Sequence, residues 1–104
     1  MNFKSILATL PDIEHLTGLN IVDGEHILCH IPAIAGKLGS LRVYNALAQQ
    51  FDGKLDRISA QKGLQMFAEH TADAEQYPGK HPNIDLLLRV VNENLSYRLV
   101  PVVA

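Results

Sequence analysis

The segment from Ser59 to Val91 constrains the fold most strongly, because it predicts two amphipathic helices joined by a short loop. In both halves apolar residues recur at helical spacing and form one face. Pro78 ends the first helix by disfavouring the helical conformation in the residue before it, and Gly79 accepts a positive φ without steric cost. The predicted helices and their N-caps are Ala60–Tyr77 with Ser59, and Ile84–Asn94 with Asn83. An ion pair between Asp85 and Arg89 is expected on the second helix.

Two further regions of the chain have the composition of strands. The runs Leu19–Val22 and Glu25–Ile31 flank Asp23-Gly24, a pair typical of two-residue hairpin turns. Alternation along the second run places Ile27, Cys29 and Ile31 on one face and His26, Leu28 and His30 on the other. The third strand is expected over Leu95–Val103, where Pro101 marks the end of the strand or an edge, since proline cannot donate to a ladder.

Two more helices complete the predicted architecture, over Asn2–Leu10 and over Leu41–Phe51, with Ser40 as the cap of the second. The segment Leu55–Ile58 is either a short strand or an extended connector. We predict an α+β fold in which the hairpin and the C-terminal strand form a small, mostly antiparallel sheet. Three helices cover one face of it: Leu41–Phe51, Ala60–Tyr77 and Ile84–Asn94. The alternative is a small α/β arrangement with Leu55–Ile58 as a further strand.

Length and charge narrow the classes of function. The 104 residues are expected to form a single domain, 1–104, which is long enough to bury a core. The net charge is −2, and the basic residues are scattered, so no nucleic-acid partner is expected. Cys29 is the only cysteine, which excludes an intrachain disulfide and suits a reducing compartment. No apolar run has the length of a membrane span or of a secretory signal. We therefore expect a cytoplasmic protein with no membrane association.

The polar residues around the predicted loop form the candidate site. The candidate ligand-binding residues are His70, Asp73, Tyr77, Lys80, His81 and Asn83. Three interpretations remain open: a metal site, an anion site at the start of the second helix, and acid–base catalysis by His70 or His81. The competing structural interpretation is a network that caps the helix ends. We assign no catalytic residue and no cofactor, and leave the metal unknown.

Three other features have residue types found in binding or catalytic sites, but each favours a structural interpretation. Gly36-Lys37-x-Gly39-Ser40 precedes a helix and offers backbone N–H groups to an anion, but it lacks the pattern of a phosphate-binding loop. His26 and His30 are too far apart on a strand to bind one metal ion. Cys29 is interpreted as a small core residue rather than a catalytic thiol.

Two stretches resemble a known family. They are GSLRVYNALA, Gly39–Ala48, and GLQMFAEHTADAEQYPGKHPNIDLLL, Gly63–Leu88. They resemble a small uncharacterised bacterial family, domain of unknown function 2322. The resemblance implies a compact bacterial protein of about this length, and it brings no activity, substrate or cofactor.

Function is therefore predicted from size and surface. The first hypothesis is a non-enzymatic protein that binds a protein partner or itself, since an apolar edge strand invites pairing with another chain. The alternative is a small enzyme, or a ligand-binding or metal-binding protein, that uses the residues around His70 and His81.

Overall fold

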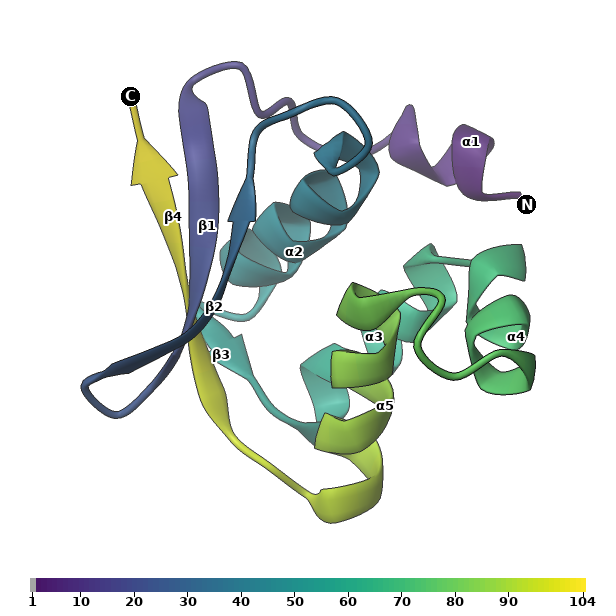
Figure 1. The fold of residues 1–104 in the computed structure, drawn as a ribbon. Coiled ribbons are helices and arrows are strands. Elements are labelled where there is room, and N and C mark those ends of the chain that lie inside the picture. The colour runs from purple at the N-terminus through teal and green to yellow at the C-terminus, as the bar shows by residue number, and fades with distance from the viewer. Residues whose placement is uncertain (1) are drawn as a thin grey trace.

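The computed structural model describes residues 2–104, and Figure 1 shows a sheet on one side and helices on the other. The described residues form, in chain order, α1 (Phe3–Leu7), β1 (Leu16–Asp23), β2 (His26–Pro32), α2 (Leu38–Gln50), β3 (Lys54–Leu55), α3 (Arg57–Met66), α4 (Glu69–Gln76), α5 (Pro82–Glu93) and β4 (Tyr97–Val103). The sheet has the order β2-β1-β4-β3, and every neighbouring pair is antiparallel. The predicted α+β class is confirmed. The short β3 pairs antiparallel with β4, which rules out a βαβ arrangement there.

The core lies between the covered face of the sheet and the helices. Its fully buried side chains include Leu19 and Ile21 of β1, Ile31 of β2, Leu41, Tyr44 and Leu47 of α2, and Leu87 and Val90 of α5. Burying one such side chain contributes about 1.5–3 kcal/mol to folding. Helix α2 packs against both the sheet and α3, and its Tyr44 hydroxyl donates a hydrogen bond to the Asn83 carbonyl at the start of α5.

The hairpin forms as predicted, but its turn is shifted by one residue. Asp23 pairs with His26, so the two loop residues are Gly24 and Glu25. Gly24 has a φ of 61°, whereas Asp23 and Glu25 keep negative φ, the pattern of a type II′ turn. The expectation that Asp23-Gly24 forms the turn is therefore wrong by one position.

A β-bulge changes which residues of β2 face the core. Ile21 pairs with Cys29 and Val22 with Ile27, which leaves Leu28 without a partner. Past the bulge the alternation is reversed, so Ile31 is buried while Ile27 is 63% exposed. The prediction that Ile27 shares the buried face is wrong for this reason.

The helix predicted over Ala60–Tyr77 is two helices. Phe67 caps the end of α3, and Ala68 has a φ of 52°, a conformation that L-residues rarely adopt. The break keeps the Phe67 side chain buried, and the Thr71 hydroxyl donates a hydrogen bond to the Leu64 carbonyl across it. No glycine or proline marks this position, so the local sequence carries no signal for the break.

Helix starts differ from the prediction by up to three residues. Asp56, not Ser59, is the N-cap of α3, and the two form a reciprocal capping box in which Ser59 is the third helical residue. Helix α2 begins at Leu38, which places Ser40 inside it. Helix α5 begins at Pro82, which is favoured at a first helical position.

The charged residues of α5 make contacts other than the one predicted for them. Asp85 accepts a hydrogen bond from the Gly79 N–H, and Arg89 pairs with Glu93, so the predicted Asp85–Arg89 pair does not form.

Pro101 faces the open edge of β4 with its backbone nitrogen. The Leu99 N–H donates to the Gly53 carbonyl, on the side of β4 away from β1, and alternation along the strand places the nitrogen of Pro101 on the same side. Pro101 therefore costs no bond to β1 and removes a donor from the open edge of β4.

Candidate functional site

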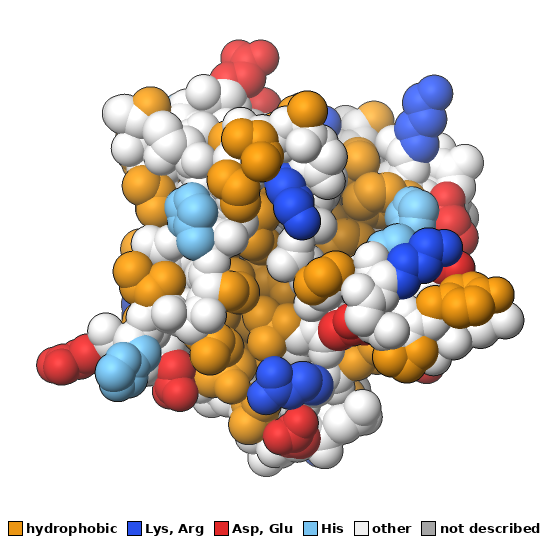
Figure 2. All heavy atoms as spheres, in the orientation of Figure 1, with side chains coloured by type: hydrophobic (Ala, Val, Ile, Leu, Met, Phe, Trp, Pro, Cys, Tyr) orange, Lys and Arg blue, Asp and Glu red, His pale blue; other side chains and the backbone are white. Residues whose placement is uncertain are grey.

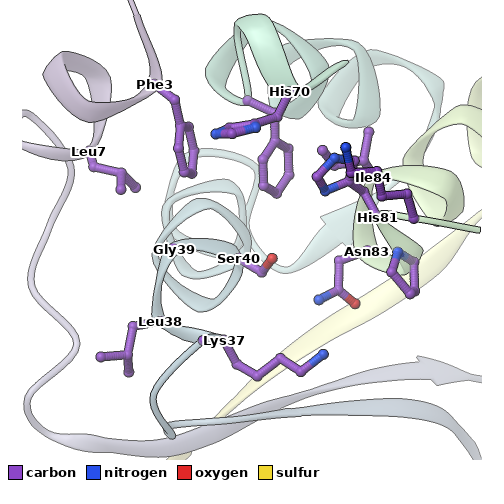
Figure 3. Close-up of a pocket in the computed structure, with 14 residues that line it drawn as sticks. Phe3, Leu7, Lys37, Leu38, Gly39, Ser40, His70, His81, Asn83 and Ile84 are labelled. Atoms are coloured by element: carbon purple, nitrogen blue, oxygen red, sulfur yellow. The ribbon is translucent and has the colours of Figure 1, made fainter. Parts of the chain in front are cut away.

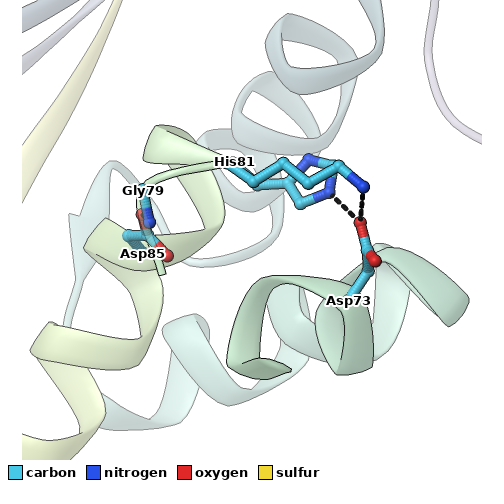
Figure 4. Close-up of polar contacts among 5 residues, drawn as sticks. Asp73, Gly79, His81 and Asp85 are labelled. Carbon is cyan, nitrogen blue, oxygen red and sulfur yellow. Dashed lines mark hydrogen bonds and ion pairs between the residues drawn. The ribbon is translucent and has the colours of Figure 1, made fainter. Parts of the chain in front are cut away.

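Asp73 joins the two sides of the predicted loop. Its carboxylate lies 2.7 Å from His81 Nε2 and 2.9 Å from Lys80 Nζ (Figure 4). These contacts, with His81 the larger cause, lower the pKa of Asp73 below its ordinary value of 3.8. The carboxylate therefore stays ionised at neutral pH and holds the Lys80 ammonium group and the His81 ring in a defined position.

Tyr77 lies beside this group rather than inside a cavity. Its side chain is 51% exposed, and Lys80 Nζ lies 5.2 Å from the centre of its ring. That distance is within the range of a cation–π contact. Tyr77 thus supports the position of Lys80 from the solvent side.

A second set of contacts places α1 against the start of α4. The Phe3 ring stacks on Phe67 with 5.5 Å between ring centres and meets the His70 ring edge-on at 4.9 Å. The Phe3 N–H donates to a Glu69 carboxylate oxygen at 2.7 Å. Backbone N–H groups, first that of Glu69 itself and then that of Phe3, lower the pKa of Glu69. The His70 and His81 rings lie 5.6 Å apart, so the contacts continue to α5.

These groups form one wall of a pocket of about 430 Å³. Its opposite wall is the start of α2, where Lys37 extends its side chain on the side away from His70 (Figure 3). The residues that line it are Phe3, Leu7, Gly36, Lys37, Leu38, Gly39, Ser40, Phe67, His70, Lys80, His81, Pro82, Asn83 and Ile84. The volume falls in the range of small-molecule sites.

The pocket combines positive and apolar surface. Lys37, His70, Lys80 and His81 lie in its lining, and none of the described lining residues is Asp or Glu. On the face in Figure 2, hydrophobic side chains lie within the hollowed part of the surface, with His and Lys side chains beside it. A negative ligand group thus meets cationic side chains, and an apolar group meets the rings of Phe3 and Phe67.

The backbone adds to the positive potential. Helices α2 and α5 both begin in the pocket lining, and neither start has a side-chain cap. The first N–H groups of a helix have no partner within it, and the helix dipole places positive potential there. At α5, Pro82 has no N–H to donate and Asp85 lies in the first turn, so the larger contribution comes from α2. Gly36, with a φ of 87°, turns the chain into α2. The Tyr44 hydroxyl donates to the Asn83 carbonyl and so links α2 to the first turn of α5.

The six candidate residues occupy three kinds of position. His70, Lys80, His81 and Asn83 line the pocket, Asp73 binds two of them, and Tyr77 lies outside. The prediction missed the contribution of α1, because nothing local to Phe3 indicates its contact with Glu69, 66 residues away. Lys37 and Ser40 belong to the Gly36–Ser40 motif, which the sequence presented as a separate feature. Among residues 2–104, no cluster of three or more His, Cys, Asp or Glu side chains is arranged to hold a metal ion.

Fold and pocket together define a small α+β protein with an antiparallel sheet and a cationic pocket at its helical end. The chain belongs to the DUF2322 family, described as an uncharacterized protein conserved in bacteria, whose family model matches residues 3–101. The family resemblance is confirmed. No curated protein and no solved structure matches the chain. Of the helices within residues 2–104, none has the length and apolar character needed to cross a membrane.

Proposed function

We propose that this protein binds a small organic anion, a carboxylate or a phosphate, in the pocket between α1, α2, α4 and α5. The observation that carries the proposal is that Lys37, His70, Lys80 and His81 line one pocket, and that none of the described residues in its lining is Asp or Glu. These side chains come from three separate parts of the chain, so neighbouring sequence does not explain why they meet. Opposite charge and hydrogen-bond donors are what an anion site requires.

Asp73 restricts the motion of a side chain that lines the pocket. A lysine in solution samples many rotamers, and binding a ligand would restrict them at a cost of about 0.5–1.5 kcal/mol. The ion pair between Asp73 and Lys80 already limits that motion. Asp73 also neutralises part of the charge of Lys80, so Lys37, which forms no ion pair with residues 2–104, supplies the less compensated charge.

The test is a titration with phenyl phosphate, benzoate and benzenesulfonate, followed by the backbone amide signals in NMR spectra. Signals of Leu38, Gly39, Ser40 and Asn83 should shift together and saturate. Lys37→Gln should weaken binding about fivefold, since a charge at a solvent-exposed rim contributes about 1 kcal/mol. Lys62→Gln, at an exposed lysine on α3 away from the pocket, is the matched control and should leave binding unchanged. Equal effects of the two variants, or no saturable shift of these amides with any probe, would contradict the proposal.

Self-association is the second candidate. It is supported by the half of β4 beyond β3, where Val100 is 42% and Val103 is 67% exposed. Pro101 works against backbone pairing at this edge, because its nitrogen faces the open side of β4 and has no N–H to donate. Sedimentation equilibrium over a hundredfold range of concentration tests it: a constant monomer mass would exclude it in that range.

A further inference from the structure

A second cavity adjoins the pocket and differs from it in chemistry. It has a volume of about 530 Å³ and lies between α1, the segment before β1 and the start of α2. Leu7, Leu38 and Gly39 line both cavities, so the two meet at these residues. The rest of the second lining is mainly apolar, with Ile13, Leu16 and Ala33.

At the boundary between the two cavities the Phe3 ring packs closely on Gly39 of α2. A Cβ atom there would lie 3.2 Å from two ring atoms of Phe3 and 3.8 Å from a methyl group of Leu7. The first distance is tighter than ordinary van der Waals contact. The boundary is therefore closed at Gly39, and the side of it that a ligand can cross is the exposed one, at Leu38.

The charged groups of the second cavity are already engaged or exposed. Arg42 Nη1 donates a hydrogen bond to the Leu7 carbonyl at 3.4 Å, and Glu14 is exposed to water. What the second cavity offers a ligand is hydrocarbon surface, including Leu38, which is 45% exposed. A large solvent-accessible leucine at the rim of a hollow is surface that an apolar ligand would cover.

We infer that the ligand is an anionic amphiphile: a carboxylate or phosphate head with a linear hydrocarbon chain. The inference rests on the proposed function for its head group. The head meets Lys37, His70, Lys80 and His81 in the first cavity, and the chain lies over the exposed side chain of Leu38, which lines both cavities, and enters the second. Charge complementarity selects one end of the ligand, and burial of hydrocarbon selects the other.

The test measures affinity against chain length by calorimetry, with straight-chain carboxylates and alkyl phosphates of two to twelve carbons below their micelle concentrations. Each added methylene that enters the second cavity should strengthen binding about threefold to fourfold, which corresponds to about 0.8 kcal/mol per buried methylene. The gain should then level off once the cavity is full. Alcohols of equal length should bind more weakly than the anions, and the two anion series show whether carboxylate or phosphate is preferred.

Ala33→Phe fills the second cavity without touching the first, because Ala33 lines only the second. It should make the gain level off at a shorter chain while binding of the two-carbon anions is unchanged. Ala8→Phe adds the same side chain at the exposed residue that caps the end of α1 and lines neither cavity, and it should behave as the unmodified protein does. Circular dichroism confirms that both variants fold.

The outcomes separate the two proposals. Short anions that bind with no gain from chain length overturn the amphiphile inference and leave the anion site standing. If affinity rises with chain length equally in Ala33→Phe and in Lys37→Gln, the hydrocarbon chain adsorbs to surface outside the second cavity, which also overturns the inference. Failure of short and long anions alike overturns both.

Discussion

Replacing Tyr44 with phenylalanine tests the contact that joins α2 to the start of α5. The Tyr44 side chain is fully buried, and its hydroxyl donates a hydrogen bond to the Asn83 carbonyl. Burial of the phenol raises its pKa well above the ordinary value of 10.0, so the hydroxyl keeps its proton at neutral pH. The substitution removes one oxygen atom and keeps the ring, so the packing of the core is retained.

The size of the effect follows from two terms. A neutral hydrogen bond contributes about 1 kcal/mol net, and an acceptor left buried without a donor adds about 1–3 kcal/mol. Asn83 is half-buried and lines the pocket, so we expect the second term to be small. We expect the free energy of unfolding to fall by about 1 kcal/mol, which lowers Tm by about 4–8 °C for a domain of this size.

Urea denaturation followed by circular dichroism measures this difference. Tyr77→Phe is the matched control, because Tyr77 is 51% exposed and water replaces whatever its hydroxyl contacts. The control should stay within about 0.5 kcal/mol of the unmodified protein. The reasoning is refuted if Tyr44→Phe changes the free energy of unfolding by no more than the control does, since the buried hydroxyl would then stabilise nothing.

Three other predictions concern stability and reactivity. Gly63→Ala should destabilise the fold by about 1 kcal/mol in urea denaturation: a Cβ would lie 2.8 and 2.9 Å from methyl groups of two fully buried leucines, and an overpacking cost of about 1–3 kcal/mol exceeds the gain of about 1 kcal/mol in helix propensity. A more stable variant would show that this helix contact has room. Asp73→Asn should lower stability at neutral pH, and the difference from the unmodified protein should vanish as the pH falls below 3.8, because a lowered carboxylate pKa stabilises only the ionised form. A pH-independent difference in denaturation midpoints would instead assign the effect to packing. Burial raises the pKa of the Cys29 thiol above 9.0, so iodoacetamide should label it more slowly at neutral pH than it labels glutathione, with a rate that climbs as the solution becomes alkaline. Labelling as fast as that of free glutathione would show that the thiol is not protected.

Helices and strands were predictable where their signals are local. The glycine of the hairpin, the alternation of Leu19 and Ile21, and the apolar stripe of α5 each depend on residues within a few positions of one another. Such patterns reflect backbone geometry and the period of the element, which act over a few residues. Predictions from these patterns located most helices and strands correctly, with errors of one to three residues at their ends.

The break at Ala68 and the bulge opposite Val22 were not predictable in this way. Ala68 adopts a positive φ that its side chain disfavours, and burial of the neighbouring Phe67 against the rest of the core compensates for it. Likewise, the bulge decides that Ile27 is exposed, although its own sequence pattern places it inside. In both cases packing against distant residues outweighs a local preference of about 1–2 kcal/mol.

For the pocket, too, local sequence identified separate parts, and long-range packing decided how they are arranged. Local sequence identified the polar residues around His81 and the loop before α2 as two separate features, because each has its own helix start. It could not show that they face one another, or that Phe3 closes the same cavity. That arrangement depends on Tyr44 and the core, where contacts between residues far apart in the chain set the position of whole helices. Periodicity and capping thus decided which segments are helices and strands, whereas only packing at long range decided which side chains meet in the pocket.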